Sequence, residues 1–399
     1  MSEVSQRINN LSESQTIAMA QRSRELKAAG KDIISLSLGE PDFPTPDFIK
    51  EAAKKAIDEN YTSYTPVSGY QELREAISKK FKRDNGLDYS IKQIVVSTGA
   101  KQSLANVILS LVNPGDEVIV PAPYWVSYLE LIKLAEGVPV LIESTIDNDF
   151  KITAEQLKQA ITPKTKLMIY SSPCNPTGSI YSKAELEALA EVISSKKDFY
   201  VISDEIYEHI NFIGKHESLA QFSSIYDQVI TVNGLSKGFA MTGWRLGYIG
   251  APEWIAKACD KMQGQVTSGT CSITQRAAIA ALEANPQEVT KEMCAAFKER
   301  KKLVVGRLKE IEGIKINDPK GAFYVFPNVE AFFGKKYGNK TIENATDLSM
   351  YILEKAEVAL VTGDAFGSPS CIRISYATST KVLTEALDRI SAALNELKA

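Results

Sequence analysis

The sequence predicts an α/β fold: a large domain whose mainly parallel sheet is sandwiched by helices, and a smaller α+β domain. From about residue 45 to 290, short continuous apolar runs alternate with segments of helical spacing. Strands that are apolar along their whole length are typical of parallel sheets covered by helices on both faces. After about residue 290 this alternation ends. A chain of 399 residues also exceeds what one core usually serves, so two domains are expected.

The large domain is expected to begin with a strand at 94–97, followed by a helix at 101–112 that Asn113-Pro-Gly115 stops. The aromatic pair Tyr124-Trp125 reads as a helix start. Capping boxes at Thr153–Gln156 and Ser182–Glu185 predict helices at 153–161 and 182–194. Further apolar runs predict strands at 117–121, 138–142, 166–170, 199–202, 229–232 and 246–249.

The small domain is expected to open with a long charged helix at about 291–310 and to close with a helix at 380–397. Between them, strands are predicted near 314–316, 322–326, 358–361 and 371–376, and residues 333–347 read as an exposed, mobile loop. The predicted division is therefore an N-terminal arm and small-domain segment at 1–45, a large domain at 46–290 and a small domain at 291–399. The arm is expected to pack on the small domain or to reach a partner subunit.

Composition excludes several classes of protein. There are 46 basic and 49 acidic residues, which gives no electrostatic case for nucleic acid or an anionic membrane. No apolar run approaches the roughly 18–20 residues that span a bilayer, and residues 1–7 lack the layout of a secretion signal. Five scattered cysteines and two histidines indicate reduced thiols in a cytoplasmic protein and no metal site.

The segment Val232–Gly247 places Lys237 in a glycine- and hydroxyl-rich loop, directly after a predicted buried strand. Desolvation and a nearby cation lower the pKa of a lysine, which makes its amine a nucleophile. Arg245, eight residues later, can bind a phosphate through its forked guanidinium. Taken alone, this segment could also be a surface loop with a solvated lysine.

Other polar side chains follow the ends of neighbouring predicted strands: Asn175 after 166–170, and Asp204 and Tyr207 after 199–202. Ligands of open α/β sheets bind at the carboxyl ends of the strands, so these groups should converge with Lys237. A lysine, a carboxylate and a phosphate site together suggest pyridoxal 5′-phosphate. Its aldehyde bonds to a lysine, and its ring nitrogen needs a carboxylate to stay protonated. Tyr207 and Asn175 could hydrogen-bond the 3-oxygen of its ring.

The phosphate of such a cofactor needs hydrogen-bond donors. Residues 97–103 join a predicted strand to a helix N-terminus, where backbone N–H groups are free and the helix dipole is positive. Gly99, Ala100 and Lys101 would supply amides, and Ser236 and Arg245 would supply side-chain donors. An ordinary βα turn is the alternative. Trp125 could stack on the ring of the cofactor or could simply be core.

The chain resembles the fold-type I, pyridoxal-phosphate-dependent aminotransferases of class I, and among them the bacterial aspartate (aspartate/prephenate) aminotransferase subgroup. The resemblance runs from Leu36-Ser-Leu-Gly-Glu-Pro-Asp-Phe43 to Cys371-Ile-Arg-Ile-Ser-Tyr-Ala377. It implies that Lys237 forms the Schiff base and shuttles the proton. It also implies that Asp204 pairs with the ring nitrogen, that Tyr207 and Asn175 contact the 3-oxygen, and that the phosphate is held by Gly99, Ala100, Lys101, Ser236 and Arg245.

The same resemblance implies the substrate contacts and the assembly. Arg373 would bind the α-carboxylate, with Gly39 and Asn175 as companions; an inter-strand salt bridge is the alternative for this arginine. Lys101, helped by Thr16, would bind a side-chain carboxylate unless it is only a solvated lysine. Tyr64 would reach the phosphate of a neighbouring subunit, so a homodimer with shared active sites is expected.

The expected activity is ping-pong transamination of aspartate and glutamate with 2-oxoglutarate or oxaloacetate. The alternatives within the family are prephenate, aromatic or alanine aminotransferases and C–S lyases, which sequence motifs separate poorly. A transcriptional regulator with an aminotransferase-like domain would carry a DNA-binding region before the fold, whereas about 40 residues precede Gly39 here. A non-catalytic binding protein would require the polar groups at the strand ends to be coincidental.

Overall fold

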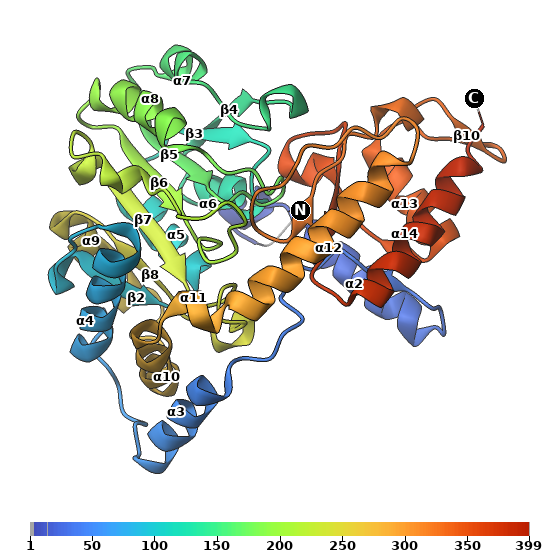
Figure 1. The fold of residues 1–399 in the computed structure, drawn as a ribbon. Helices are drawn as coiled ribbons and strands as arrows, with labels where there is room; N and C mark the ends of the chain where they lie inside the picture. Colours follow the sequence, from blue (N-terminus) through green and yellow to red (C-terminus); the bar gives the residue numbers. More distant parts are fainter. Residues whose placement is uncertain (1–3, 14, 399) are drawn as a thin grey trace.

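A seven-stranded sheet forms the centre of the larger part of the molecule (Figure 1). The computed structural model describes residues 4–13 and 15–398. One strand, β8, runs antiparallel to its two neighbours and the other pairs are parallel, which confirms the predicted mainly parallel sheet. In spatial order the strands are β2 (Ile94–Ser97), β8 (Gly247–Gly250), β7 (Val229–Gly234), β6 (Tyr200–Asp204), β5 (Thr165–Ser171), β3 (Glu117–Ala122) and β4 (Val138–Glu143).

Helices cover both faces of this sheet, and the strands are apolar on both sides for that reason. Side chains alternate between faces along a strand, so Ile94 and Val96 join one core cluster and Val95 joins the other. On the Val95 face lie α5 (Ala100–Leu111), α6 (Ser127–Leu134) and α9 (Glu253–Val266). On the opposite face lie α3 (Asp47–Asp58), α4 (Gln71–Lys80), α7 (Ala154–Ala160), α8 (Lys183–Ser194) and α10 (Ser272–Glu283).

Two helices begin where the sequence has capping boxes. Thr153 and Ser182 cap α7 and α8 through complete capping boxes, as predicted. The expected helix start at Tyr124-Trp125 is wrong, since α6 begins at Ser127. The Tyr124 amide donates instead to the Phe366 carbonyl, 3.1 Å away, which draws this segment toward the C-terminal part of the chain.

The C-terminal part forms a second hydrophobic core with its own small sheet. Its helices are α12 (Lys291–Lys309), α13 (Ala345–Ala356) and α14 (Thr380–Asn395). Its antiparallel strands are β13 (Val361–Thr362), β14 (Ile372–Ser375) and β9 (Tyr324–Val325), in that spatial order. The helix α12 runs from the larger part into this one (Figure 1).

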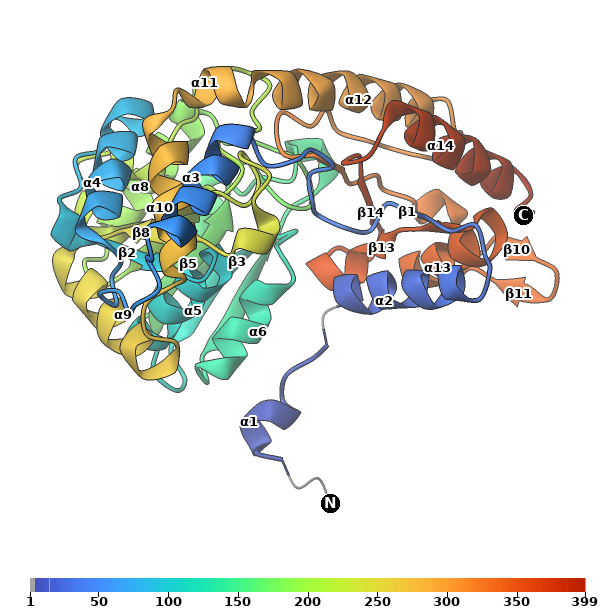
Figure 2. The ribbon, with the colours of Figure 1, turned by 90° about the horizontal axis from the view of Figure 1, so that it is seen from below.

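The N-terminal arm packs on the C-terminal part, which is one of the two arrangements that the sequence predicted. The strand β1 (Ile34–Ser35) pairs in parallel with β12 (Val358–Ala359). The helix α2 (Gln15–Ala28) lies beside α13 on this side of the molecule, whereas the short α1 (Gln6–Asn9) projects away from it (Figure 2).

One expectation for the C-terminal part is wrong, and another holds only in part. No strand forms near 314–316; within the described residues Lys315 makes only an isolated bridge to Asn328. The segment 333–347 is largely exposed, as expected, but it is not a loop throughout, because β10 (Lys336–Tyr337) and β11 (Lys340–Thr341) form a hairpin. The centroid of the Tyr337 ring lies 4.4 Å from that of the Tyr351 ring in α13. This contact holds the charged hairpin against the C-terminal core.

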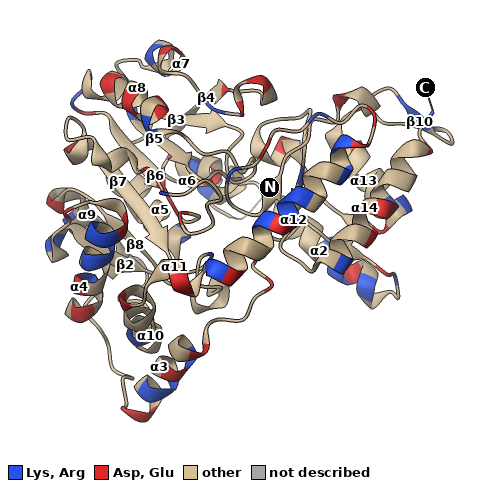
Figure 3. Cartoon of the chain, viewed as in Figure 1, with Lys and Arg blue, Asp and Glu red and all other residues tan. Residues whose placement is uncertain are grey.

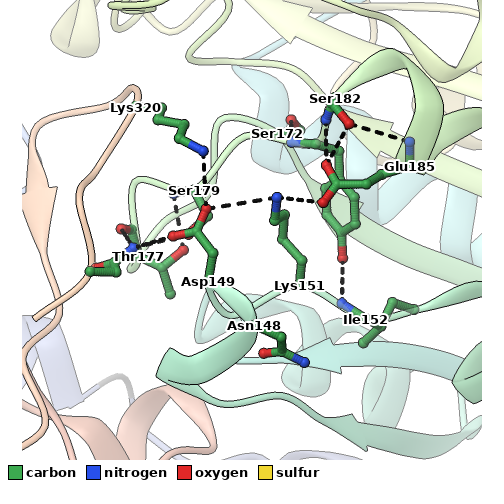
Figure 4. Close-up of polar contacts among 12 residues, drawn as sticks. Asn148, Asp149, Lys151, Ile152, Ser172, Thr177, Ser179, Ser182, Glu185 and Lys320 are labelled. Atoms are coloured by element: carbon green, nitrogen blue, oxygen red, sulfur yellow. Dashed lines mark hydrogen bonds and ion pairs between the residues drawn. The ribbon is translucent and has the colours of Figure 1, made fainter.

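Asp149 ties the C-terminal part to the carboxyl edge of the large sheet (Figure 4). Its Oδ1 accepts hydrogen bonds from Asn317 Nδ2 at 2.8 Å and from Ser179 Oγ at 3.4 Å. The ammonium groups of Lys151 and Lys320 both lie 3.7 Å from Oδ2. The segment that leads into β9 is therefore fixed directly beside the strand ends that carry the predicted site.

A buried ionic cluster lies under the turn that follows β6. Lys80 pairs with Glu208, and His216 Nε2 lies 2.9 Å from Glu205 Oε2. All four side chains are buried. Glu205, Glu208 and His216 could face a metal ion, but the Lys80 ammonium already neutralises Glu208 here. Because burial is offset chiefly by the charges of Lys80 and the histidines, the pKa of Glu208 is held well below its usual range.

We expect Lys80→Met to destabilise the fold by about 3–5 kcal/mol, since it removes the ammonium that pairs with the buried Glu208 charge and leaves His209 Nε2, 3.2 Å away, as the nearest basic group. The free energy of unfolding in urea measures this. Lys82→Met is the matched control, because Lys82 pairs with Asp88 on the surface and such a pair contributes about 1 kcal/mol or less. Equal small losses in the two variants would show that the buried pair does not stabilise the fold.

The surface carries charges of both signs. Lysine and arginine are interspersed with aspartate and glutamate along the outer helices, among them α4 and α12 (Figure 3). Among the described residues, no helix is long and apolar enough to cross a bilayer.

Candidate active site

A cavity of about 260 Å³ opens at the carboxyl ends of β5, β6 and β7, where the C-terminal part meets the sheet. It brings together most of the site residues that the sequence predicted, from segments far apart in the chain. The predicted residues that line it are Thr16, Gly39, Ala100, Lys101, Trp125, Asn175, Asp204, Tyr207, Ser236, Lys237, Arg245 and Arg373.

Lys237 lies in the loop after β7, and its Nζ donates a hydrogen bond to the Gly39 carbonyl. Desolvation lowers the pKa of Lys237 to about 8, with Arg373 and Arg245 acting in the same direction and Glu40 and Asp204 opposing them. A lysine with such a pKa carries a neutral amine in an appreciable fraction of molecules near neutral pH. Lys237 is therefore suited to act as a nucleophile and a base.

Asp204 is the last residue of β6, and its carboxyl group is buried. Burial raises the pKa of Asp204 to about 6, although hydrogen bonds oppose this shift. Its Oδ2 accepts a hydrogen bond from Tyr128 Oη at 2.7 Å, and its Oδ1 accepts one from the Ile206 amide at 3.3 Å. A buried carboxyl with this pKa favours a cationic partner in the cavity.

Part of the cavity lining offers donors for an anion. Gly99 is the N-cap of α5, and the amides of the first turn have no acceptor within the helix. A side chain at Gly99 would collide with the Arg245 guanidinium, so a glycine with φ of +83° is required for the close approach of the two. Ser236 and Ala100 also line the cavity. Backbone amides, a hydroxyl and a guanidinium together match a phosphate group.

Arg373, in β14, is 2% exposed and has no carboxylate within ion-pair distance among the described residues. The alternative of an inter-strand salt bridge is therefore wrong. Its guanidinium donates to Asn175 Oδ1 at 3.0 Å and to the Ser37 carbonyl at 2.6 Å, while its buried Nε has no hydrogen-bond partner in the described part of the chain. A buried cation with an unused donor, facing a cavity, is suited to bind a carboxylate.

At the mouth of the cavity, Lys101 Nζ lies 4.9 Å from the centre of the Trp125 ring. Partial burial, and then the charge of Arg245, lower the pKa of Lys101. Thr16 Oγ1 is buried without a hydrogen-bond partner in the described residues. Ser14, in the same N-terminal segment, lies outside the described residues. The mouth therefore offers a cation and a free hydroxyl.

Two tyrosines that line the cavity were not among the predicted site residues. Tyr128 lies three residues after the predicted Trp125, but only the fold brings its hydroxyl to Asp204. Tyr324 lies in β9, and its hydroxyl forms a 2.8 Å hydrogen bond with that of Tyr207. A side chain at Gly39 would collide with this Tyr324 hydroxyl. No motif in the sequence could have identified either contact, because each joins residues on different elements.

Two predicted site residues, Gly99 and Tyr64, do not line this cavity. Gly99 directly precedes the lining residue Ala100, whereas Tyr64 lies elsewhere on the surface. Its side chain is 100% exposed. A large aromatic residue left fully in solvent is available for contact with another subunit, which the prediction for Tyr64 requires.

These groups fit pyridoxal 5′-phosphate. A lysine amine, a buried carboxyl and an anion cradle surround one cavity, which Arg373, with its unpartnered Nε, also lines. The arrangement can bond an aldehyde, pair with a protonated ring nitrogen and hold a phosphate and a substrate carboxylate.

Comparison with known proteins shows similarity over nearly the whole chain. The model of the family described as aminotransferase class I and II matches residues 31–390. The aspartate/prephenate aminotransferase of Cereibacter sphaeroides is 48% identical over 382 residues, 95% of this chain and 95% of that protein. The crystal structure of the aspartate aminotransferase of Rhizobium meliloti has a TM-score of 0.96 and 42% identity, covering 100% of both chains. The Thermus thermophilus aspartate aminotransferase with maleate has a TM-score of 0.91 and 39% identity, covering 98% of this chain and 100% of that one.

Proposed function

The chain belongs to the class I and II aminotransferase family, as its resemblance predicted, and from this premise we propose that it transfers the amino group of aspartate and glutamate to 2-oxo acids. It is a pyridoxal 5′-phosphate-dependent enzyme, because the members of this family use that cofactor. The acceptors would be 2-oxoglutarate and oxaloacetate. The observation that carries the proposal is the convergence of Lys237, Asp204 and Arg373 on one cavity.

When bound, the cofactor supplies an aldehyde that bonds to amines and a ring that withdraws electrons from the α-carbon of the amino acid. Ala100, Lys101, Ser236 and Arg245 would hold its phosphate beside Gly99. Asp204 would pair with its ring nitrogen and keep it protonated. Tyr207 and Asn175 would face the 3-oxygen, and Trp125 would cover the ring.

The residues of the chain then divide the chemistry. Arg373 would bind the α-carboxylate through its forked guanidinium and so orient the α-carbon. Lys237 Nζ would take the α-proton and return it to the aldehyde carbon of the cofactor, acting first as a base and then as an acid. The same two residues would serve the second half-reaction in reverse, which gives ping-pong kinetics.

The preference for dicarboxylic substrates rests on the mouth of the cavity. Lys101 is the cation nearest Trp125 there, and the unpartnered Thr16 hydroxyl faces the same cavity. A side-chain carboxylate would be held by these two groups while Arg373 holds the α-carboxylate. The related Thermus thermophilus enzyme was crystallised with maleate, which is also a dicarboxylate.

We expect Lys101→Ala to raise the KM for aspartate and glutamate by about 10-fold or more, since a charge-assisted hydrogen bond is lost. The KM for alanine and phenylalanine should change far less, because these substrates have no second carboxylate. Steady-state kinetics with the four amino acids measure the difference. Equal effects on both classes of substrate would remove Lys101 from this role.

Prephenate is a second candidate acceptor, because the Cereibacter sphaeroides relative is described as acting on it as well as on aspartate. A panel with aspartate, glutamate, alanine, tyrosine and arogenate as donors separates the candidates. Aspartate and glutamate should give the highest kcat/KM. A thioether amino acid such as cystathionine is added to the panel as a separate substrate. Release of pyruvate, ammonia and a thiol from it would instead identify a C–S lyase.

For the assembly, we propose a homodimer in which Tyr64 completes the phosphate site of the neighbouring subunit. The full exposure of Tyr64 supports this. We further propose that residues 1–45, 46–290 and 291–399 act as arm, large domain and small domain, in keeping with the separate hydrophobic cores. Five free cysteines support a cytoplasmic location.

A further inference from the structure

The Asp204 carboxyl depends on one side chain for its hydrogen bonding. Among the described residues it accepts only two hydrogen bonds, from Tyr128 Oη at 2.7 Å and from the Ile206 amide at 3.3 Å. The tyrosine bond is the shorter one, and it lowers the pKa of Asp204 against the effect of burial.

Tyr128 is held firmly in the place where this bond forms. It lies in the first turn of α6 and is 1% exposed. Its ring meets the Trp125 ring edge-to-face, with centroids 5.6 Å apart at 85°. Burial, and then the nearby Asp204 charge, hold the pKa of Tyr128 well above its usual range, so its hydroxyl stays protonated and acts as a donor.

We propose that Tyr128 is a positioning residue whose hydroxyl keeps the Asp204 carboxylate ionised and oriented toward the ring nitrogen of the cofactor. This inference rests on the proposed function of Asp204. The tyrosine occupies Oδ2 from the α6 side, which leaves lone pairs of the carboxylate for a donor in the cavity. Tyr128 also packs on Trp125, so one side chain connects the partner of the ring nitrogen to the aromatic wall of the site.

The physical reason is the low polarity around Asp204. A buried carboxyl without hydrogen-bond donors favours its neutral form, and a neutral carboxyl cannot hold a pyridinium proton. Loss of the tyrosine hydroxyl would leave only the longer bond from the Ile206 amide. The interaction of the Asp204 carboxylate with the ring nitrogen would then be weaker, and it would be lost at a higher pH as the solution is acidified.

A structural role is the competing explanation, since buried tyrosine hydroxyls usually have a partner in any protein. Tyr170 provides the matched control. It is also buried, it lies on β5 beside β6, and its Oη accepts a hydrogen bond from Ser203 Oγ at 2.9 Å. It does not line the cavity.

The experiment compares Tyr128→Phe with Tyr170→Phe in the full chain. The dissociation constant of pyridoxal 5′-phosphate, from equilibrium dialysis, should rise about 10-fold or more in Tyr128→Phe only, as expected for loss of a bond to a charged group. The acid limb of the kcat/KM profile should move to higher pH by about one pH unit in the same variant, because the pKa of Asp204 rises. Identical behaviour of the two variants in both measurements would overturn the inference.

A double-mutant cycle with Asp204→Asn separates the inference about Tyr128 from the proposed function of Asp204. If Tyr128 acts through Asp204, Tyr128→Phe should have no further effect on cofactor affinity once Asp204 is replaced. An undiminished effect in the Asp204→Asn background would assign Tyr128 a role of its own and overturn the inference. Wild-type cofactor affinity and turnover in Asp204→Asn alone would instead refute the proposed function of Asp204.

Discussion

Lys237→Ala should lower kcat by at least about 10⁴-fold, because it removes a group that acts as both acid and base, and such groups typically contribute about 10²–10⁴-fold each. The structure gives this lysine no substitute. Within the described residues, the other cations that line the cavity are Lys101, Arg245 and Arg373. The arginines remain protonated at any working pH and cannot act as bases, and Lys101 lies at the mouth beside Trp125. Single-turnover and steady-state assays on the purified variant measure the loss.

Lys237→Arg is the control for charge. It keeps a cation in the loop after β7 but has no amine of low pKa, so its turnover should be as low as that of Lys237→Ala. The visible absorbance that arises from covalently attached cofactor should also be absent from both variants. Turnover near the wild-type rate in either one would contradict the assignment of Lys237.

Asp204→Ala should lower kcat by about 10²–10³-fold or more, the range found when one preorganised charge or donor at a reacting centre is removed. The carboxylate is buried at the end of β6, where the low polarity strengthens its interaction with a cation. Without it, the ring nitrogen of the cofactor would lose its proton at neutral pH and the ring would withdraw electrons poorly.

Asp204→Asn tests charge separately from shape, since the amide fills the same space. Its kcat should fall nearly as far as that of Asp204→Ala, whereas its free energy of unfolding should change less. Rate constants for both half-reactions, measured by stopped-flow absorbance, would report the loss directly. Unchanged half-reaction rates in Asp204→Asn would show that another group supports the ring nitrogen.

The sheet and the strand-end groups could be predicted from the sequence because their causes are local. Uninterrupted apolar runs such as 199–202 require burial on both faces, and this identifies a parallel sheet. The carboxyl ends of parallel strands lie at one edge, so Asn175, Asp204 and Lys237 had to converge. Their convergence on one cavity follows this rule.

The C-terminal part was predicted less well because its strands are short and depend on tertiary contacts. The predicted strand at 358–361 is divided between β12 and β13, which pair with different partners. The hairpin at 336–341 is stabilised by the packing of Tyr337 on Tyr351, and nothing in the local sequence indicates that contact. The intrinsic strand propensity of residues gives little guidance for strands of only two residues, such as β10 to β13.

The site residues also divide into those that local sequence predicts and those that depend on tertiary contacts. Lys237 and Asp204 follow strands directly and could be identified by spacing. Arg373 and Gly39 came from family resemblance, and the structure then gave their physical basis: an unused guanidinium Nε and a close approach to Tyr324. Tyr128 could not be identified from either source, since only the packing of α6 on the Val95 face of the sheet brings it to Asp204.

The most direct test of the account is the site of covalent attachment of the cofactor. The enzyme is loaded with pyridoxal 5′-phosphate, reduced with borohydride and digested, and the modified peptide is identified by mass spectrometry. We expect the label on Lys237 Nζ alone, in the peptide that follows β7. A label on Lys101 or on any other lysine, or no label at all, would contradict the account.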